Sequence, residues 1–204
     1  MTPATPEARL ALARRRPPED VARQRRLVAD LPGARLLMAA PGLNMILNGE
    51  RQIVAASRLA LETFALPLET ALGMRPGEAL RCVRAAQTPG GCGTTDFCAE
   101  CGAVNAILGG LAGRKTAKEC RISRRRGELV ESLELRVVAS PLVVEGEPFA
   151  IFAIQDISHE KRRRALERDH RRHLSEQADP RDRQQMLDAL GVLASLLSLQ
   201  SQTL

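Results

Sequence analysis

The sequence predicts an α+β domain in which short helices lie on one side of an antiparallel sheet. Three observations support this prediction. The 204 residues are 44% hydrophobic and 26% charged, which is ordinary for a globular protein. Apolar runs of strand type occur in two groups, separated by short segments rich in Gly and Pro. The resulting order, two strands, several short helices and three longer strands, gathers the helices on one face of the sheet.

Two helices are expected before the sheet. The first lies in an N-terminal extension that we place at residues 1–34, and the second begins where this extension ends. The first covers Pro18–Leu31, because proline is tolerated in the first turn of a helix and the following acidic residues suit its positive end. Pro32 and Gly33 end it. A second helical segment is expected at residues 34–40, where another Pro-Gly pair follows.

A β-hairpin is expected next, because the apolar runs LNMILN and QIVAAS surround a turn at Gly49-Glu50. The following segment, 57–66, has the apolar spacing of a helix, and Ser57 is suited to be its N-cap. Residues 68–85 are interrupted by Pro and Gly, so short helices and turns are expected there.

A cysteine-rich loop at 86–102 and a helix at 103–111 precede the second group of strands. These three strands are expected at about 117–125, 128–143 and 147–157. The middle one alternates apolar and polar residues, which indicates one buried face. The last one, PFAIFAIQDI, is apolar almost throughout and is therefore predicted to be a central strand.

The end of this last strand resembles a known family. Gln155-Asp156-Ile157-Ser158 passes into a charged helix, as in PAS domains, where an Asp-Ile-Ser/Thr turn leads into a signalling helix. LNMILNGERQIVAASRLALETF resembles the first PAS hairpin and the helix after it. The resemblance covers roughly residues 35–160, and we place the domain at 35–158. It implies a PAS-like five-stranded sheet and a sensor and dimerisation module, which often holds a cofactor between the sheet and the short helices.

Five cysteines are the most distinctive chemical feature of the chain. GCGTTDFCAECG places Cys92, Cys98 and Cys101 in a C-x5-C-x2-C cluster, and Cys120 follows after 18 residues, at the start of a predicted strand. Four thiolates can bind a metal, and the neighbouring glycines allow backbone amides to turn toward the sulfurs. A ligand on a distant strand would fasten the loop to the sheet. We therefore predict that these four cysteines bind a metal or cofactor.

An iron–sulfur cluster of the 2Fe–2S type is the predicted cofactor, because C-x5-C-x2-C…C differs by one residue from the plant-type ferredoxin spacing. Zinc is the first alternative, although structural zinc sites usually have two C-x2–4-C pairs and this chain has one. Redox-active thiols without a cofactor, or a disulfide such as Cys98–Cys101, are the second. Cys82, expected on a helix, is interpreted as a buried small hydrophobe or as a substitute ligand. The segment MRPGEALRC and the loop after it resemble a cysteine-rich subset of PAS domains in bacterial sensor histidine kinases.

Residues 159–204 are expected to form a helical dimerisation and output tail. One helix is predicted at 159–177, where Leu166, His170, His173 and Gln177 would form a polar seam. After Pro180, a second helix at 181–202 would present an apolar seam of Met186, Leu190, Leu193 and Leu197. In a homodimer this hairpin would make a four-helix bundle.

This bundle resembles a degenerate dimerisation and phosphoacceptor region of sensor histidine kinases. An acidic residue usually follows the phosphoacceptor histidine, but Arg171 follows His170 and Leu174 follows His173. The 204 residues also leave no room for an ATP-binding domain, so no enzyme activity is expected.

Charge and composition narrow the function classes. The net charge of +6 comes largely from short Arg and Lys runs, interpreted as solvated faces, and the lack of Trp and Tyr disfavours base stacking. There is no apolar run of about 18 residues and no signal-peptide pattern, so we expect a cytoplasmic protein that uses no membrane. The prediction is a redox or oxygen sensor of a two-component system that acts on a signalling protein partner. A zinc-stapled interaction module is the first alternative, and a DNA-binding regulator, suggested by the basic tail, is the second.

Overall fold

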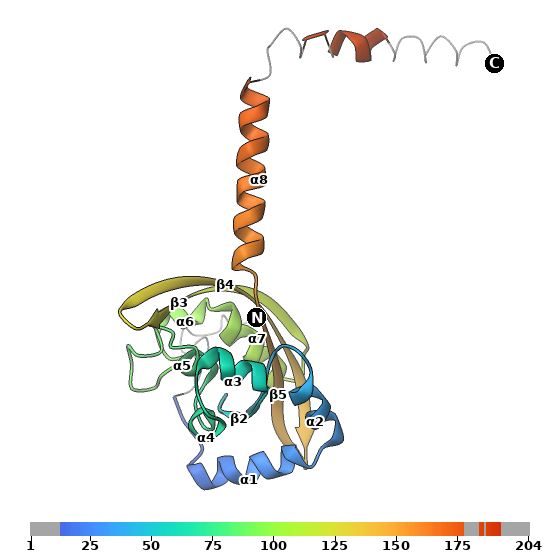
Figure 1. Ribbon diagram of the computed structural model, residues 1–204. Coiled ribbons are helices and arrows are strands. Elements are labelled where there is room, and N and C mark those ends of the chain that lie inside the picture. The colour runs from blue at the N-terminus through green and yellow to red at the C-terminus, as the bar shows by residue number, and fades with distance from the viewer. Residues whose placement is uncertain (1–12, 178–183, 186, 193–204) are drawn as a thin grey trace, which may run out of the picture. The chain divides into compact units, whose positions relative to one another are not determined.

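The computed structural model describes residues 13–177, 184–185 and 187–192 of the chain. The chain divides into two compact units, Met1–Ser158 and His159–Leu204. The first unit contains a five-stranded antiparallel sheet in the order β2-β1-β5-β4-β3, with helices packed against it (Figure 1). This arrangement confirms the predicted α+β class and the predicted five-stranded antiparallel sheet.

The strands follow the predicted order with boundaries shifted by a few residues: β1 (Leu43–Asn48), β2 (Ile53–Ala56), β3 (Thr116–Arg126), β4 (Leu129–Val144) and β5 (Glu147–Asp156). β1 and β2 form the expected hairpin. β5 lies at the centre of the sheet, paired with β1 on one side and β4 on the other, as its apolar sequence predicted. Both faces of this strand are covered, which explains why its sequence lacks the usual polar alternation.

One face of the sheet carries the short helices predicted by the Gly- and Pro-rich middle of the chain. They are α3 (Arg58–Phe64), α5 (Pro76–Ala79), α6 (Asp96–Ala99) and α7 (Gly102–Leu111), while α4 (Leu68–Ala71) contacts β2. Phe64 and Ile107 from the helices join Met45, Val137 and Phe152 from the strands in one buried core. The predicted N-cap is confirmed, because Ser57 Oγ accepts a hydrogen bond from the Ala60 amide at 3.3 Å.

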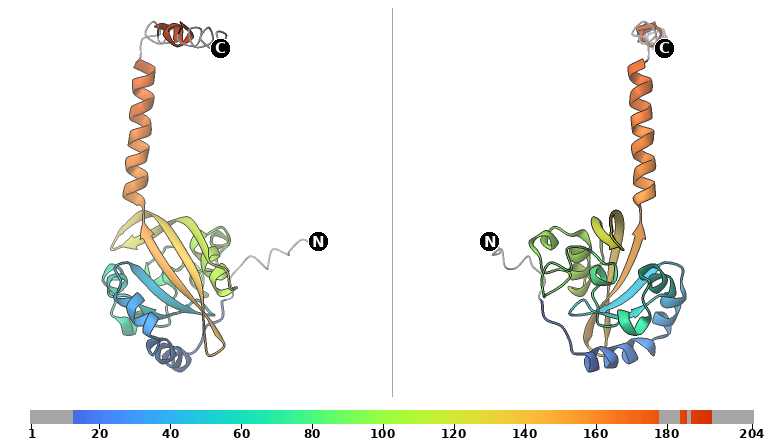
Figure 2. Two further views of the ribbon diagram at one scale, coloured as in Figure 1. Left: turned by 90° about the vertical axis from the view of Figure 1, so that its right-hand side faces the viewer. Right: turned by 60° about the vertical axis from the view of Figure 1, so that its left-hand side comes forward.

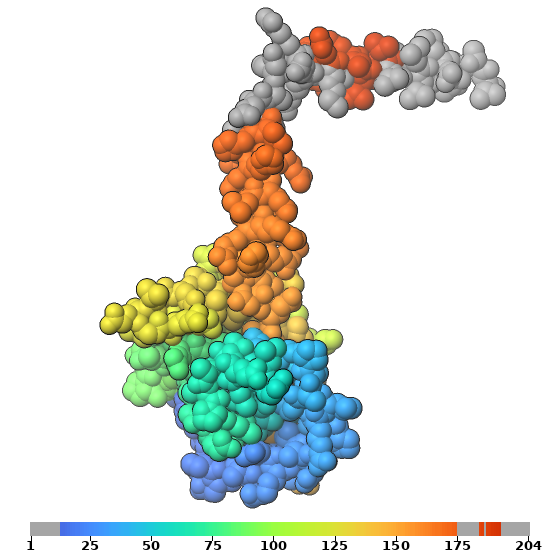
Figure 3. Space-filling model, in the orientation of Figure 1, coloured from blue at the N-terminus to red at the C-terminus, as the bar shows by residue number. Residues whose placement is uncertain are grey.

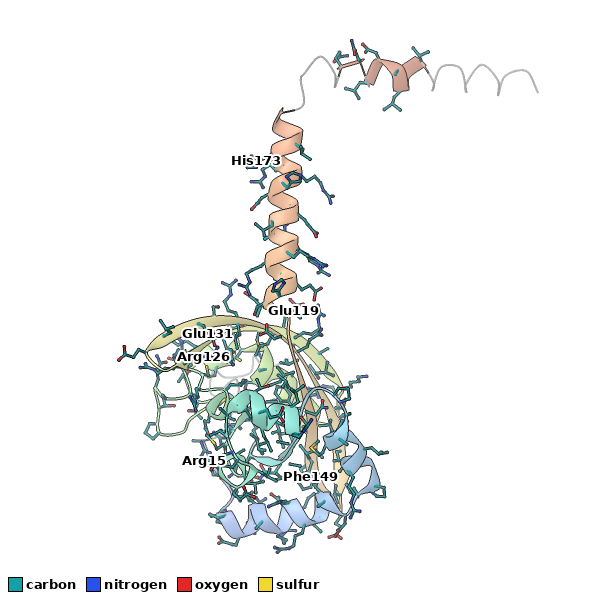
Figure 4. The ribbon with its side chains drawn as sticks, viewed as in Figure 1. Arg15, Glu119, Arg126, Glu131, Phe149 and His173 are labelled. Atoms are coloured by element: carbon teal, nitrogen blue, oxygen red, sulfur yellow. The ribbon has the colours of Figure 1, made fainter. Side chains whose placement is uncertain are left out.

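The other face of the sheet is covered by the two N-terminal helices, α1 (Pro18–Ala29) and α2 (Pro32–Ala39). Val21 and Val28 of α1 pack with Ile46, Val54 and Phe149 of the strands in a second buried core. Phe149 (labelled in Figure 4) is 1% exposed, and burying a side chain of this size stabilises a fold by roughly 1.5–3 kcal/mol. The two helices are thus part of the same packed unit as the sheet.

The hairpin of β3 and β4 extends beyond the helices and projects from the edge of the unit (yellow in Figure 3). Its tip exposes Leu129 and Val130. Charged pairs lie directly opposite each other along this hairpin, namely Arg121–Glu134, Arg124–Glu131 and Glu119–Arg136. Cross-strand pairs of opposite charge favour the observed register. Arg124 belongs to one of the basic runs that were predicted to be solvated, and it forms an ion pair with Glu131.

The second unit contains most of α8 (Ser158–Gln177), which matches the helix predicted at 159–177. Leu166, His170 and His173 are exposed on it, and His173 Nδ1 lies 3.0 Å from the carbonyl of Asp169 (Figure 4). Of the second predicted helix, residues 184–185 and 187–192 are helical and Leu190 is exposed, whereas Met186, Leu193 and Leu197 lie outside the described residues. No helix in the described part of the chain has the length and apolar character that a membrane crossing requires.

Candidate functional site

All five cysteines line one cavity of about 440 Å³ in the first unit. The cavity lies between the helices α5, α6 and α7 and the inner surface of β3, β4 and β5, where Leu135, Val137 and Phe152 form part of its wall. The four cysteines predicted as ligands, Cys92, Cys98, Cys101 and Cys120, are therefore brought together, and Cys82 joins them. All five are free thiols.

Each cysteine reaches the cavity from a different local structure. Cys82 lies after α5 and forms an isolated bridge with Arg124, so the prediction that it is helical was wrong: a left-handed residue, Arg81 (φ 56°), ends the helical turn. Cys92 is in the loop before α6, and Cys98 is in α6. Cys101 is the N-cap of α7, and Cys120 lies within β3 rather than at its start.

The local backbone lowers the pKa of several of these thiols. The Gly77 backbone lowers that of Cys92, and the backbone of Arg84 and Ala85 lowers that of Cys82, in both cases against the larger effect of burial. At the start of α7, the backbone of Val104 and Ala103 lowers the pKa of Cys101, and that of Ala103 lowers the pKa of Cys120. Backbone dipoles with this effect favour the negatively charged form of sulfur.

Cys101 and Cys120 interact with each other in the cavity. The Cys120 thiol donates a hydrogen bond to Cys101, which lowers the pKa of Cys101 below its usual range; burial opposes this shift, and the α7 amides reinforce it. The same hydrogen bond, together with burial, raises the pKa of Cys120. The pair therefore stabilises a Cys101 thiolate beside a protonated Cys120.

The other three thiols differ from this pair. Burial raises the pKa of Cys92 to about 12 and also raises that of Cys82. The Cys98 sulfur lies 3.1 Å from the hydroxyl oxygen of Thr95. Within residues 13–177 and the two short described segments after them, no three Cys, His, Asp or Glu side chains converge closely enough to hold one metal ion.

The loop that carries Cys92 is held by a fully buried arginine, Arg75. Its guanidinium donates to the carbonyl oxygens of Gly90 (2.7 Å) and Cys92 (3.2 Å), and also to that of Glu50 (3.1 Å) in the hairpin turn. Burial lowers the pKa of Arg75 to about 10, and the charges of neighbouring arginines add to this effect. At neutral pH the group is still a cation, so it can hold several carbonyl dipoles at once.

Glu78, whose charge is opposite to that of Arg75, holds the same loop. Its carboxylate accepts hydrogen bonds from the amides of Cys92 (3.1 Å) and Arg75 (2.9 Å) and from the Arg15 guanidinium. Burial raises the pKa of Glu78, but the bonds from Arg15, Arg75 and Cys92 outweigh it and hold the pKa below its usual range. Arg75 and Glu78 both lie within MRPGEALRC, but the sequence alone had indicated no role for either residue. An Arg and a Glu three residues apart around Pro-Gly, just before a cysteine-rich loop, was the available signal.

Two close approaches keep the cavity wall compact. A Cβ atom on Gly77 would lie 2.6 Å from the Cys92 sulfur, and a Cβ atom on Gly102 would lie 2.2 Å from the carbonyl oxygen of Glu119. Both distances are shorter than any tolerated contact. Glycine therefore lets α5 approach the Cys92 loop and lets the start of α7 approach β3, which places Cys101 beside Cys120.

The rim of the cavity carries an exposed aromatic side chain. Phe97, in α6 next to Cys98, is 63% exposed, and the Arg84 guanidinium carbon lies 3.7 Å from the centre of its ring. Both residues line the cavity. A cation–π contact of this kind fixes two otherwise mobile side chains at the rim.

No protein-family model matches the sequence, and no curated protein matches it. Solved structures that resemble this chain include a light-oxygen-voltage domain, at 17% identity and a TM-score of 0.43, with 70% of this chain and 97% of that chain covered. The PAS domain of nitrogen regulation protein NR(II) from Vibrio parahaemolyticus is 12% identical, with a TM-score of 0.43 and coverage of 62% and 99%. The PAS domain of an HTR-like protein from Haloarcula marismortui is 19% identical, with a TM-score of 0.42 and coverage of 66% and 98%. Similarity of this extent assigns no ligand, activity or partner to this chain.

Proposed function

We propose that the chain is a PAS-type sensory module of a signal-transduction protein, and that its cysteine-lined cavity holds an iron–sulfur cluster that responds to redox state or oxygen. One observation carries this proposal. Five thiols, from five different places in the fold, line a single cavity of about 440 Å³ between the sheet and the short helices. Thiols that served only to pack the core would not need to gather on one internal surface, and a purely thiolate donor set is the one that iron–sulfur clusters use.

Cys92, Cys98, Cys101 and Cys120 are the proposed ligands, and Cys82 lines the same cavity as a substitute. Because no three side chains of the described residues converge on one ion, the proposal requires these cysteines to close in when a cluster binds. When bound, a cluster would supply one-electron redox chemistry that no side chain of this unit provides. The backbone near Cys82, Cys92 and Cys101 lowers the pKa of each of these thiols and so favours thiolate charge. The apolar wall of Leu135, Val137 and Phe152 excludes water from the inner side of the cavity.

A short route connects the cavity to the first turn of α8. Cys120 precedes Arg121, which lies opposite Glu134 of β4. The Glu134 carbonyl accepts from the Ile157 amide at 2.8 Å, and its amide donates to Ser158 Oγ at 2.9 Å. The Ser158 amide in turn donates to Asp156 Oδ1 at 2.8 Å. We propose that a shift of β3 at Cys120 is passed through Glu134 to this Asp-Ile-Ser segment and so to the start of the output helix.

A thiol switch without a cofactor is a second candidate, favoured by the hydrogen bond between Cys120 and Cys101. Oxidation of this pair to a disulfide would remove two electrons and two protons, and a hydroperoxide that accepts them would become water and an alcohol. The new bond would lock the start of α7 to β3. The sequence had suggested Cys98 and Cys101 as a pair, and Cys101 also packs against the cluster that contains Cys98.

The proposal is tested by purifying the full chain without oxygen and measuring its visible absorption, iron, acid-labile sulfide and zinc on one sample. Iron with equimolar sulfide and visible absorption is the expected result. A colourless protein with one zinc ion per chain would replace the sensor with a zinc-stapled interaction module. A colourless, metal-free protein whose Cys101 and Cys120 become disulfide-linked under a hydroperoxide would establish the thiol switch instead.

A further inference from the structure

Residues 13–16 pass beside the cysteine loop before the chain enters α1. Both views of Figure 2 show this N-terminal segment running from α1 alongside the green loops of the cysteine site, and Figure 4 labels Arg15 within it. The Arg16 amide donates to Gln52 Oε1 at 2.7 Å, and Gln52 Nε2 donates back to the Arg16 carbonyl at 3.1 Å. The segment, called the strap below, is thus fixed to the turn of the first hairpin.

Two charged groups, the buried Arg75 and the half-buried Glu78, bind the strap and the cysteine loop at the same time. The Arg75 guanidinium donates to the strap carbonyls of Ala13 (3.2 Å) and Arg14 (2.7 Å) as well as to the loop carbonyls of Gly90 and Cys92. A single oxygen of the Glu78 carboxylate, Oε1, accepts from both the Arg15 guanidinium and the Cys92 amide. Each group therefore has one set of partners in the strap and one in the loop.

These shared atoms couple the two segments energetically. If the strap leaves, the Glu78 carboxylate, whose side chain is 16% exposed, loses its guanidinium partner. The charges of Arg51 and Arg75 remain near Glu78, but the carboxylate has then lost its hydrogen-bonded cation. This loss favours openings that let water reach the carboxylate, and the Cys92 amide is released in such openings. The coupling also acts in the reverse direction. If attachment of the strap stabilises the Cys92 loop, then the ordered loop stabilises attachment of the strap by the same free energy.

We propose that the strap is a positioning element of the cysteine site, and that the state of the Cys92 loop and the attachment of residues 13–16 control each other. This deepens the proposed function, since it names a regulator of the same site: a partner that captures the N-terminal segment would loosen the Cys92 loop, and a change at Cys92 would release the segment. Arg15 acts through Glu78 and does not itself contact a sulfur.

Hydrogen exchange of the full chain, without added metal, tests the first direction. Arg15→Ala is expected to raise exchange of the Cys92 amide about ten-fold, as loss of one charge-assisted hydrogen bond implies, and to leave the centre of β4 unchanged. Arg15→Lys keeps a cation beside Glu78 and is expected to restore most of the protection. Arg14→Ala is the matched control, because it removes the same charge from a side chain that is 70% exposed and 4.0 Å from Glu50.

Unchanged exchange of the Cys92 amide in Arg15→Ala would overturn the proposal. An equal rise at Cys92 and in β4 would overturn it as well, because that pattern reports a general loss of stability. The reverse direction is tested with Cys92→Leu, which enlarges a side chain packed against Gly77 and leaves the strap untouched. Tryptic cleavage after Arg15 is expected to become several-fold faster in this variant, and an unchanged rate contradicts the coupling.

Neither measurement uses a cofactor, so the two proposals fail separately. A chain that binds no cluster but shows both changes would overturn the iron–sulfur proposal and keep the coupling. A chain that binds a cluster but shows neither change would keep the sensor and remove the strap from its mechanism.

Discussion

Glu78 offers the sharpest test of how the cysteine loop is held. Its carboxylate accepts from the amides of Cys92 and Arg75 and from the Arg15 guanidinium. Glu78→Gln keeps the shape of the side chain but removes its charge and replaces one acceptor oxygen with an NH2 donor. Because both oxygens of the carboxylate face donors, one of these donors must then face another donor.

The magnitude follows from these contacts. A donor left unsatisfied inside the protein costs about 1–3 kcal/mol, and the remaining bonds lose their charge assistance, worth about 1 kcal/mol in total after allowance for the partial exposure of Arg15. We therefore expect Glu78→Gln to lower the free energy of unfolding by about 2–4 kcal/mol. For a domain of this size the loss corresponds to a fall in Tm of roughly 5–10 °C.

Urea unfolding followed by circular dichroism measures this loss, since the chain has no Trp or Tyr to report by fluorescence. Glu62→Gln is the control, because the side chain of Glu62 is 57% exposed and only pairs with Arg58 one turn away; its expected effect is below about 0.5 kcal/mol. A loss below that value in Glu78→Gln would refute the role of the carboxylate in holding the Cys92 loop.

Four further predictions follow, the first on the pH dependence of Glu78→Gln and the others on different contacts. The difference in the free energy of unfolding between wild type and Glu78→Gln should shrink as the pH falls below about 4. The folded-state pKa of Glu78 is lowered, so its carboxylate stabilises the fold above its unfolded-state pKa, and this stabilisation is lost as the carboxylate is protonated. A difference in urea titrations that does not depend on pH would contradict this. Gly102→Ala should cost at least about 2 kcal/mol by clashing with the Glu119 carbonyl, whereas Gly33→Ala, with no atom within 4 Å, should be near neutral in thermal unfolding. Phe149→Ala should cost about 3–5 kcal/mol and Leu129→Ala, 74% exposed, under about 0.5, and similar losses for both would argue against the packing of α1 on the sheet. In the metal-free, reduced chain at pH 7, Cys101 should react with iodoacetamide faster than Cys82, and peptide mass spectrometry finding the reverse order would contradict the hydrogen bonding at Cys101.

The elements that local pattern controls were predictable from the sequence. Alternation in β4, the apolar run of β5 and the hairpin around Gly49 each depend on residues close in the chain, and the Ser57 cap depends on a single hydroxyl. Cys82 shows the limit of such reasoning: its apolar neighbours have helical spacing, but a left-handed Arg81 and a bridge to Arg124 remove it from the helix. That bridge depends on a strand about 40 residues further along the chain, which local periodicity does not contain.

The candidate site was predictable in its members but not in its support. Cysteine spacing identified the four proposed ligands, because metal and cluster sites use short, recurring separations. The roles of Arg75 and Glu78 depend on which carbonyls and amides the folded loop presents to them. The interaction of Cys101 with Cys120 depends on the approach of α7 to β3 at Gly102, which cysteine spacing does not contain. Contacts of this kind are set by tertiary packing and leave no periodic pattern in the sequence.

Iron and acid-labile sulfide per chain, measured in anaerobically purified wild type and in single Cys→Ser variants, test the central claim most directly. The account predicts equimolar iron and sulfide in wild type and their loss in the serine variants of Cys92, Cys98, Cys101 and Cys120. Ala117→Ser, an exposed β3 position with no predicted role, should retain both. Full retention of iron and sulfide in the four cysteine variants, or their absence from wild type, would contradict it.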